Sequence, residues 1–289
     1  MKTNYCSSDK SVEKTVIKHG KISNKPQDGS ICSLLIEDVQ TIPQDIDLQQ
    51  YHSEILTGNS TVQLTIDESS SQLDRQIERA IKWMGDNEVA LVKIVLPALS
   101  DQEECPKNNQ LKFKITLIDH KPVKPIWDWT PQEKFDKALE RKETGVELVN
   151  KSRTKDAFYK FSKAVKIIIS MEPIKDLNLD DNLNNKINDL RVSLYNNMAM
   201  CQLKYNNYDH TIELCNKVLM RDKNNVKALY RRGCAYGAIT NVEKALDDFK
   251  YAHHIEPQNN AVKSQLLIYQ EKWKKAEKET KDIIRKMFT

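Results

Sequence analysis

The chain has 289 residues, of which 39% are hydrophobic and 30% are charged, a composition typical of a globular protein with much exposed helix. Its formal net charge of +4 at pH 7 is too small to indicate a nucleic-acid partner. No stretch approaches the ~20 consecutive apolar residues that a membrane span requires, so we expect no membrane partner either.

The cysteines and histidines carry no recognisable site. The six cysteines contain no C-x-x-C pair and the six histidines have no metal-binding spacing, so we expect neither a metal nor a cofactor. Unpaired cysteines and the lack of an apolar leader favour a location in the cytoplasm, with the nucleus also open to the protein.

The first part of the chain has the pattern of a sheet. Residues 1–13 are polar and are expected to be disordered, whereas residues 14–122 are rich in strand patterns. Two segments alternate apolar and polar residues, as half-buried strands do: TVQLTI (61–66) and LKFKITL (111–117). Two others are more continuously apolar, as central strands are: ICSLLIEDV (31–39) and VALVKIVL (89–96). Between them, LDRQIERAIKWM (73–84) has one apolar helical face. We predict an antiparallel sheet wrapped on one short helix.

A change of pattern follows at residues 123–130, where prolines and tryptophans form a stiff linker. Thr130, Pro131 and Glu133 then make a helix start: an N-cap threonine, proline at the first helical position and glutamate three residues after the cap. The remainder of the chain has helical periodicity. The fold class is therefore a two-domain α+β chain, with an all-α C-terminal part.

A shift of 34 residues superposes this helical part on itself, as in tetratricopeptide repeats. Small residues and phenylalanines recur at fixed spacing, and a proline ends the last pair: Gly145, Ala199, Gly233, Phe161, Phe249 and Pro257. We predict three repeats within residues 131–260, at 131–170, 192–225 and 226–259, with roughly twenty extra residues (172–191) after the first. Residues 261–289 would form a basic C-terminal capping helix that closes the superhelix.

The first helix of each pair in such an array lines a concave groove. By this register the groove carries Lys142, Asn197, Lys227 and Arg231, and the last two are one turn apart on one face. Three cations and an amide favour an extended acidic peptide as ligand, because charge-assisted hydrogen bonds to carboxylates are strong. The alternative is a solvated basic face; Arg232 is offset by about 100° and is expected to be structural or solvated.

The chain also resembles the large immunophilins of the FKBP type that contain tetratricopeptide repeats. The resemblance rests on WDWTPQEKFDKALERKETG (127–145), NNMAMCQLKYNNYDHTIELCNKVL (196–219), VKALYRRGCAY (226–236) and the ending IIRKMF (283–288). It is strong from residue 127 onward and weak before it, and it is greatest to members with a degenerate sheet domain. It implies an FKBP-like domain at 14–122 followed by a tetratricopeptide repeat superhelix.

The resemblance implies that the repeats bind the acidic C-terminal peptide of heat shock protein 90 through a carboxylate clamp. Lys142, Asn197, Lys227 and Arg231 match the clamp, whereas Val146 stands where the family often has asparagine. The loss of one amide would make the free energy of ligand binding less favourable by about 1–2 kcal/mol. The implied function is a co-chaperone adaptor that links the chaperone to client proteins whose identity the sequence does not reveal.

The isomerase pocket of the family is degenerate in this chain. Leu73, Asp74, Ile77 and Phe113 occupy its positions; Ile77 replaces a tryptophan and Asp74 an apolar residue, and only Phe113 is the expected aromatic. The loop PALSDQEECPKNNQ (97–110) has no aromatic residue. We therefore expect no catalytic residue and no isomerase activity. Three alternatives stay open: an active isomerase with a remodelled pocket, a germline small-RNA co-chaperone of the same architecture, and a scaffold without a chaperone ligand.

Overall fold

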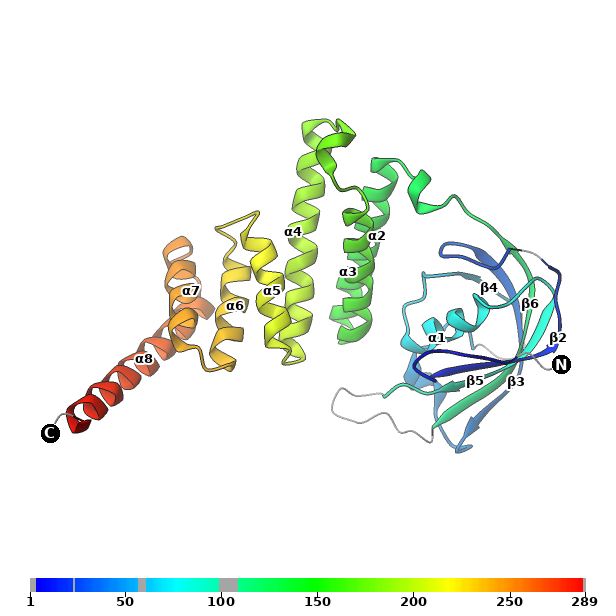
Figure 1. The fold of residues 1–289 in the computed structure, drawn as a ribbon, viewed down its shortest axis with the longest axis horizontal. Helices are drawn as coiled ribbons and strands as arrows, with labels where there is room; N and C mark the ends of the chain where they lie inside the picture. The colour runs from blue at the N-terminus through cyan, green and yellow to red at the C-terminus, as the bar shows by residue number, and fades with distance from the viewer. Residues whose placement is uncertain (1–3, 23, 57–60, 99–108, 288–289) are drawn as a thin grey trace. The chain divides into compact units, whose positions relative to one another are not determined.

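The structure is a computed structural model that describes residues 4–22, 24–56, 61–98 and 109–287. The chain divides into two compact units, residues 1–128 and residues 129–289, so that the division falls inside the predicted linker (Figure 1). Among the described residues, no helix combines the length and the hydropathy that a membrane crossing needs. No group of three or more metal-ligating side chains occurs in the described ranges either.

The first unit is a six-stranded antiparallel sheet with the strand order β1-β2-β5-β6-β3-β4 (Figure 1). The one α-helix among the described residues of this unit, α1, spans Gln72–Ile81 and is capped by the Ser71 side chain, which accepts a hydrogen bond from the Asp74 N–H. The prediction of an antiparallel sheet with one short helix is therefore confirmed. The strands are β1 (Asn4–Cys6), β2 (Val12–Lys18), β3 (Ile31–Ile42), β4 (Thr61–Thr65), β5 (Glu88–Val95) and β6 (Gln110–Lys121).

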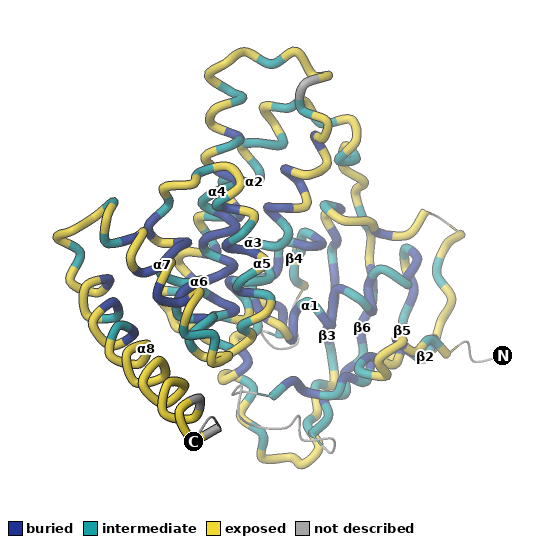
Figure 2. The backbone as a smooth tube through the Cα atoms, turned by 60° about the vertical axis from the view of Figure 1, so that its left-hand side comes forward, coloured by how far each residue is buried: buried dark blue, intermediate teal, exposed yellow. Residues whose placement is uncertain are grey.

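The core of this unit lies between α1 and one face of the sheet. Burial alternates along β5 and β6, as expected for strands with one covered face, and Figure 2 shows this alternation as a change of colour along each strand. The helix contributes a row of fully buried apolar residues that packs against the covered face: Leu73, Ile77, Ala80 and Ile81. Apolar residues at the spacing of one helical face thus position α1 on the sheet.

The N-terminal segment corrects one expectation. Residues 4–6 form strand β1, which pairs with β2 so that Tyr5 lies opposite Lys14, and Val12 is fully buried. The expected disorder over residues 1–13 is therefore wrong for the described residues 4–13. The physical reason is a long-range contact, because the Tyr5 ring stacks on Trp83 with 6.2 Å between centroids. Residues 1–3 lie outside the described ranges.

The second unit consists of helices that pack in chain order, each against the next (Figure 1). The first helices of successive pairs also contact one another, α2 with α4 and α4 with α6, as the concave side of a repeat superhelix requires. The predicted all-α repeat architecture is confirmed. The helices are α2 (Pro131–Asn150), α3 (Thr154–Ile169), α4 (Asp181–Lys204), α5 (Tyr208–Leu219), α6 (Val226–Ala238), α7 (Val242–Ile255) and α8 (Asn260–Met287).

The repeated glycines lie where the two helices of a pair approach closely, as expected, but the phenylalanines correct the expectation that they fill the space between pairs. A Cβ atom added to Gly145 would lie 2.5 Å from Phe161 Cε1, and one added to Gly233 would lie 2.9 Å from the Phe249 ring. Each phenylalanine is fully buried and occupies the space that its glycine leaves between the two helices of a pair. The contact therefore lies within a pair rather than between pairs.

The insertion after the first repeat differs from a simple loop. Residues 174–177 form a short 3-10 helix, η3, and α4 already begins at Asp181 rather than near residue 192. The Asp180 side chain accepts a hydrogen bond from the Leu183 N–H at 2.6 Å and so starts the helix early. The extra residues therefore lengthen the first helix of the second pair by about three turns.

The terminal helix α8 packs only near its start. Tyr269 is buried and its ring lies 5.2 Å from that of Phe249, while beyond Lys272 almost every described side chain is exposed (Figure 2). The first turns of α8 thus cover the last repeat.

Candidate functional site

The groove residues sit on the first helices of the second and third pairs. Asn225 caps α6: its side-chain oxygen accepts a hydrogen bond from the Ala228 N–H at 3.0 Å. This cap sets the helical phase in which Lys227 and Arg231 lie one turn apart. Asn197 comes from the middle of α4, the helix that contacts α6.

These residues meet at one cavity. A cavity of about 440 Å³ lies between α4 and the start of α6, and it brings together Asn197, Lys227 and Arg231, three of the four groove residues named from the sequence. Lys142 is half-buried on α2 and does not line this cavity. Val146 lies one turn further along α2 and is exposed. The cavity is also lined by Asp189, Val192, Ser193, Asn196, Asp222, Asn224, Asn225, Val226 and Glu256.

Arg231 is the central cation of the cavity. Its guanidinium is largely withdrawn from solvent, and its Nη1 donates a hydrogen bond to Asn196 Oδ1 at 3.1 Å. It forms no ion pair with any residue that the structure describes. Burial lowers the pKa of Arg231, yet a guanidinium stays protonated at neutral pH. A partly buried positive charge that has no carboxylate partner favours the binding of an anion.

A chain of amides holds this arginine, and sequence reasoning missed it. Asn196 is buried and donates through Nδ2 to Asn225 Oδ1 at 3.1 Å, while Asn225 Nδ2 donates to Asp222 Oδ2 at 2.9 Å. The helix cap of α6 is thereby tied to α4 and to the turn before α6. A second asparagine beside Asn197, inside an otherwise apolar helical pattern, was the signal available in the sequence.

Three carboxylates line the cavity and weaken its attraction for an anion. Asp222 is engaged by Asn225 and by the Asn224 N–H, and Glu256 accepts from Asn259 Nδ2 at 2.9 Å. Asp189 is exposed on α4. Asp189 and Glu256 are open to solvent, so their fields are screened more strongly than that of the withdrawn Arg231.

Arg232 points away from the groove, as its helical phase predicts. Its Nε and Nη2 bind the two carboxylate oxygens of Asp248 at 2.9 and 2.6 Å, and its Nη1 donates to Asn216 Oδ1 at 2.7 Å. This bidentate pair joins α6 to α7 and α5. Arg232 is structural, and it is not part of the cavity.

The four residues at the isomerase positions lie together and are buried in the described part of this unit. Leu73, Ile77 and Phe113 are fully buried in one apolar cluster. Asp74 is buried beside them; it accepts hydrogen bonds from the Ser53 hydroxyl and, at 2.8 Å, from the Glu54 N–H. Burial raises the pKa of Asp74 although these bonds oppose the shift. Residues 99–108 of the loop without aromatics lie outside the described ranges.

Comparison with known proteins agrees with this architecture. The family model "BDBT FKBP like N-terminal" matches residues 5–122, and "Bride of doubletime-like, TPR domain" matches residues 130–213. Peptidyl-prolyl cis-trans isomerase FKBP4 of Bos taurus is 28% identical over 269 residues, which are 91% of this chain and 55% of that protein. FK506-binding protein 59 of Drosophila melanogaster is 29% identical over 218 residues, 74% of this chain and 48% of that protein.

The solved structure of residues 1–211 of CG17282 aligns with 73% of this chain and with 97% of its own chain, with a TM-score of 0.59. The sequence identity is 20%, so this match supports the fold alone. Together the matches define a class of proteins in which an FKBP-like domain precedes tetratricopeptide repeats. The chain thus combines an FKBP-like N-terminal domain with a tetratricopeptide repeat domain, each matched by a Bdbt-like family model, and it is homologous to the immunophilins FKBP4 and FK506-binding protein 59. It spans about half the length of the curated relatives it matches.

Proposed function

We propose that the repeat domain binds the acidic C-terminal tail of heat shock protein 90, and that the chain is a non-catalytic co-chaperone adaptor that links this chaperone to client proteins. The observation that carries the proposal is the partly buried Arg231, which has no ion-pair partner among the described residues and lies beside Lys227 and Asn197 in one cavity. A cytoplasmic or nuclear location would follow from such a partner.

The chemistry of the cavity suits a chain-terminal carboxylate. Arg231 has further N–H donors after its bond to Asn196, Lys227 adds a solvent-facing ammonium, and the Asn197 amide can donate a hydrogen bond. A carboxylate bound by all three would replace the missing ion-pair partner of Arg231. Lys142, on α2, would reach a second acidic group further along an extended peptide.

The position of Val146 reduces the affinity expected of this site. A valine offers no donor to a ligand oxygen, so one hydrogen bond of about 1–2 kcal/mol would be lost relative to an asparagine there. We therefore expect weaker binding than in a groove with all five polar residues, by about tenfold.

Calorimetric titration of the full chain with a peptide ending in Met-Glu-Glu-Val-Asp tests the proposal. We expect saturable binding that is lost in Lys227→Glu and weakened by salt, because exposed cations are screened within about 10 Å at 0.1 M. Lys223→Glu is the matched control, since Lys223 is exposed on the turn before α6 and does not line the cavity. Absent binding, or equal binding by the Lys227→Glu variant, would rule the clamp out.

The proposal of a non-catalytic FKBP-like domain rests on the burial of Leu73, Ile77 and Phe113 and on the engaged carboxylate of Asp74. Isomerisation requires an apolar site that can receive an X-Pro bond and lower a barrier of about 18–20 kcal/mol. Side chains that fill the core cannot receive it. A protease-coupled assay with a proline peptide should show no turnover above background; measurable turnover would favour a remodelled isomerase.

A further inference from the structure

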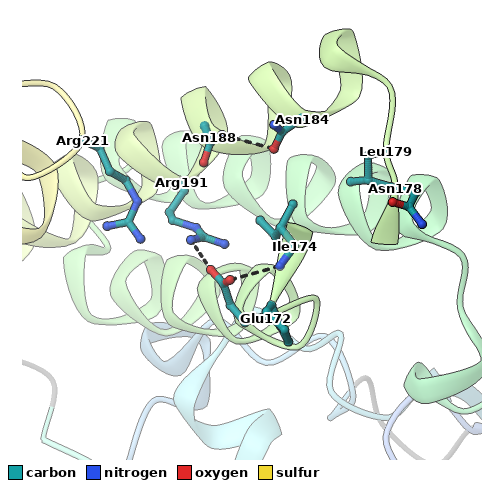
Figure 3. Close-up of a pocket in the computed structure, with 9 residues that line it drawn as sticks. Glu172, Ile174, Asn178, Leu179, Asn184, Asn188, Arg191 and Arg221 are labelled. Carbon is teal, nitrogen blue, oxygen red and sulfur yellow. Dashed lines mark hydrogen bonds and ion pairs between the residues drawn. The ribbon is translucent and has the colours of Figure 1, made fainter. Parts of the chain in front are cut away.

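A second cavity lies on another side of α4, where the insertion after the first repeat meets this helix. It has a volume of about 590 Å³ and is lined from η3, α4 and the turn after α5 (Figure 3). Apart from Pro173, its lining residues are those labelled in Figure 3: Glu172, Ile174, Asn178, Leu179, Asn184, Asn188, Arg191 and Arg221. None of them lines the cavity that holds Arg231.

Arg191 is the unusual residue of this second cavity. Its side chain is 4% exposed, and its Nη1 donates to Glu172 Oε1. Its Nε and Nη2 are buried and have no hydrogen-bond partner among the described residues. These two nitrogens form one edge of the guanidinium, the edge that binds oxyanions in bidentate fashion. An unpaired edge in a buried position is costly, and an incoming oxyanion would satisfy it.

Glu172 satisfies Arg191 only in part. One of its carboxylate oxygens bonds Arg191 Nη1, and the other accepts from the Ile174 N–H at 3.3 Å, so no bidentate pair forms. The Glu172 side chain is 44% exposed, which leaves it room to turn out into solvent. Glu172 is the one carboxylate among the residues that line this cavity.

Arg221 supplies a second cation from the turn after α5. It is exposed, and its Nη1 donates only to the Lys217 carbonyl oxygen, at 3.2 Å. Burial alone would raise the pKa of Glu172, but the bond and charge of Arg191, the Ile174 N–H and the charge of Arg221 together lower it. Both arginines therefore act on the same carboxylate, and the cavity holds two positive charges against one negative.

We propose that this cavity binds a phosphate group, which displaces the Glu172 carboxylate from Arg191 and pairs with Arg221 as well. The Glu172 carboxylate already binds Arg191 Nη1 but leaves the edge formed by Nε and Nη2 without a partner among the described residues. A phosphate has oxygens in tetrahedral array, so it can accept from Arg191 and Arg221 at the same time. The amides of Asn184 and Asn188 lie in the same cavity as further donors. The phosphate would be free phosphate or the phosphoryl group of a modified peptide side chain.

Calorimetric titration of the full chain at low salt, with inorganic phosphate and with N-acetyl-O-phosphoserine amide, tests this site. We expect binding that weakens about threefold or more in Arg221→Ser and strengthens about threefold or more in Glu172→Gln, since the latter removes the internal competitor. Tighter binding of the phosphoserine probe would identify a modified peptide as the source, and equal binding would identify free phosphate.

Three controls make the result decisive. Lys223→Ser removes one positive charge, as Arg221→Ser does, and Glu213→Gln removes one negative charge, as Glu172→Gln does. Both positions are exposed and lie outside the cavity, so these variants should leave phosphate binding unchanged. Lys227→Glu should also leave it unchanged, which separates this site from the proposed peptide clamp. Absence of phosphate binding, insensitivity to either Arg221→Ser or Glu172→Gln, loss in Lys227→Glu, or equal affinity for acetate would overturn the proposal.

Discussion

Arg231 of α6 is held by Asn196 of α4, whose side-chain oxygen accepts a hydrogen bond from Nη1 at 3.1 Å. The two residues are separated by 35 positions, one repeat and one residue, so the bond joins the first helices of successive pairs. Asn196 in turn donates to Asn225, the cap of α6. The proposed anion-binding arginine is thereby positioned before any ligand arrives, which lowers the cost of ordering it on binding.

Replacing Asn196 should weaken peptide binding without any loss of a ligand contact. We expect Asn196→Leu to lower the affinity for the acidic peptide about tenfold, since Arg231 loses its fixed acceptor. Asn196→Asp should lower it at least as much, because the new carboxylate would pair with Arg231 in place of the ligand. Calorimetric titration measures both, with Asn185→Asp at an exposed position of α4 as control. If both variants bind like the natural chain, Asn196 does not position Arg231.

Replacing Val146 should strengthen binding of the acidic peptide, whereas replacing Asn196 should weaken it. We expect Val146→Asn to tighten binding of the acidic peptide about fivefold to tenfold, because an amide then faces the ligand at the position that lacks one. Val146 is 38% exposed, so the change should leave stability nearly unaltered. Ile169→Asn, at an exposed position on α3, is the matched control for the loss of apolar surface. A fall in affinity would show that α2 does not face the peptide.

The exposed carboxylate of Asp189 should oppose an acidic ligand. Asp189→Asn removes one negative charge from the cavity wall, and we expect affinity to rise about twofold to fivefold at low salt. The gain should shrink as salt is raised, because an exposed charge is screened. Titrations at two salt concentrations, with Asp181→Asn as control, measure the effect. A gain that does not depend on salt would point to a change in packing rather than in charge.

Lys14 and Glu88 form a buried ion pair in the FKBP-like domain, with 2.5 Å between Nζ and Oε1. Lys14→Met would leave Glu88 buried without its cation and should cost about 3–5 kcal/mol. Adding Glu88→Gln should recover much of this loss, since the uncompensated charge is gone. Hydrogen exchange of the β2 and β5 amides, followed by mass spectrometry, reports the local free energy of opening. Equal protection in the single and double variants would contradict the pairing.

The buried cysteines should be unreactive in the folded chain. Burial raises the pKa of Cys32 to about 12, of Cys215 to about 12 and of Cys201 to about 11. At pH 8 their thiolate fraction is then about 0.1% or less, and solvent cannot reach them. Among the cysteines that the structure describes, Cys6 is exposed and should react first with a thiol reagent. Mass spectrometry of labelled peptides gives the order, which should be lost in urea; fast labelling of Cys215 would contradict this packing.

Much of the helical unit could be predicted because its signals are local and repeated. The capping box at Thr130 and Glu133 is present, with the Thr130 N–H bound to Glu133 Oε2 at 2.6 Å. The 34-residue register marked Gly233 and Phe249 as repeat positions, but only the structure shows that the Phe249 ring fills the space that Gly233 leaves within its own helix pair. The start of α4 was missed, because the repeat pattern says nothing about turns added outside it.

The candidate site was predicted less completely than the fold. Lys227 and Arg231 were placed on one face by helical periodicity, and the structure gathers them with Asn197. The amide chain through Asn196 and Asn225 was not foreseen, because it depends on the distance between two helices. Asp74 was assigned to a degenerate pocket, yet its carboxylate is occupied by Ser53 and Glu54, which precede it by about twenty residues.

The sequence by itself determined which segments are helices and strands, and which cations share a helical face, because periodicity and capping act over a few neighbouring residues. Only the tertiary structure decided which of those groups are buried, paired or free. Arg231, Arg232 and Arg191 are identical side chains, but Arg231 meets an asparagine, Arg232 a bidentate aspartate and Arg191 a half-exposed glutamate. The difference lies in partners 35, 16 and 19 residues away, which helix packing alone brings into contact.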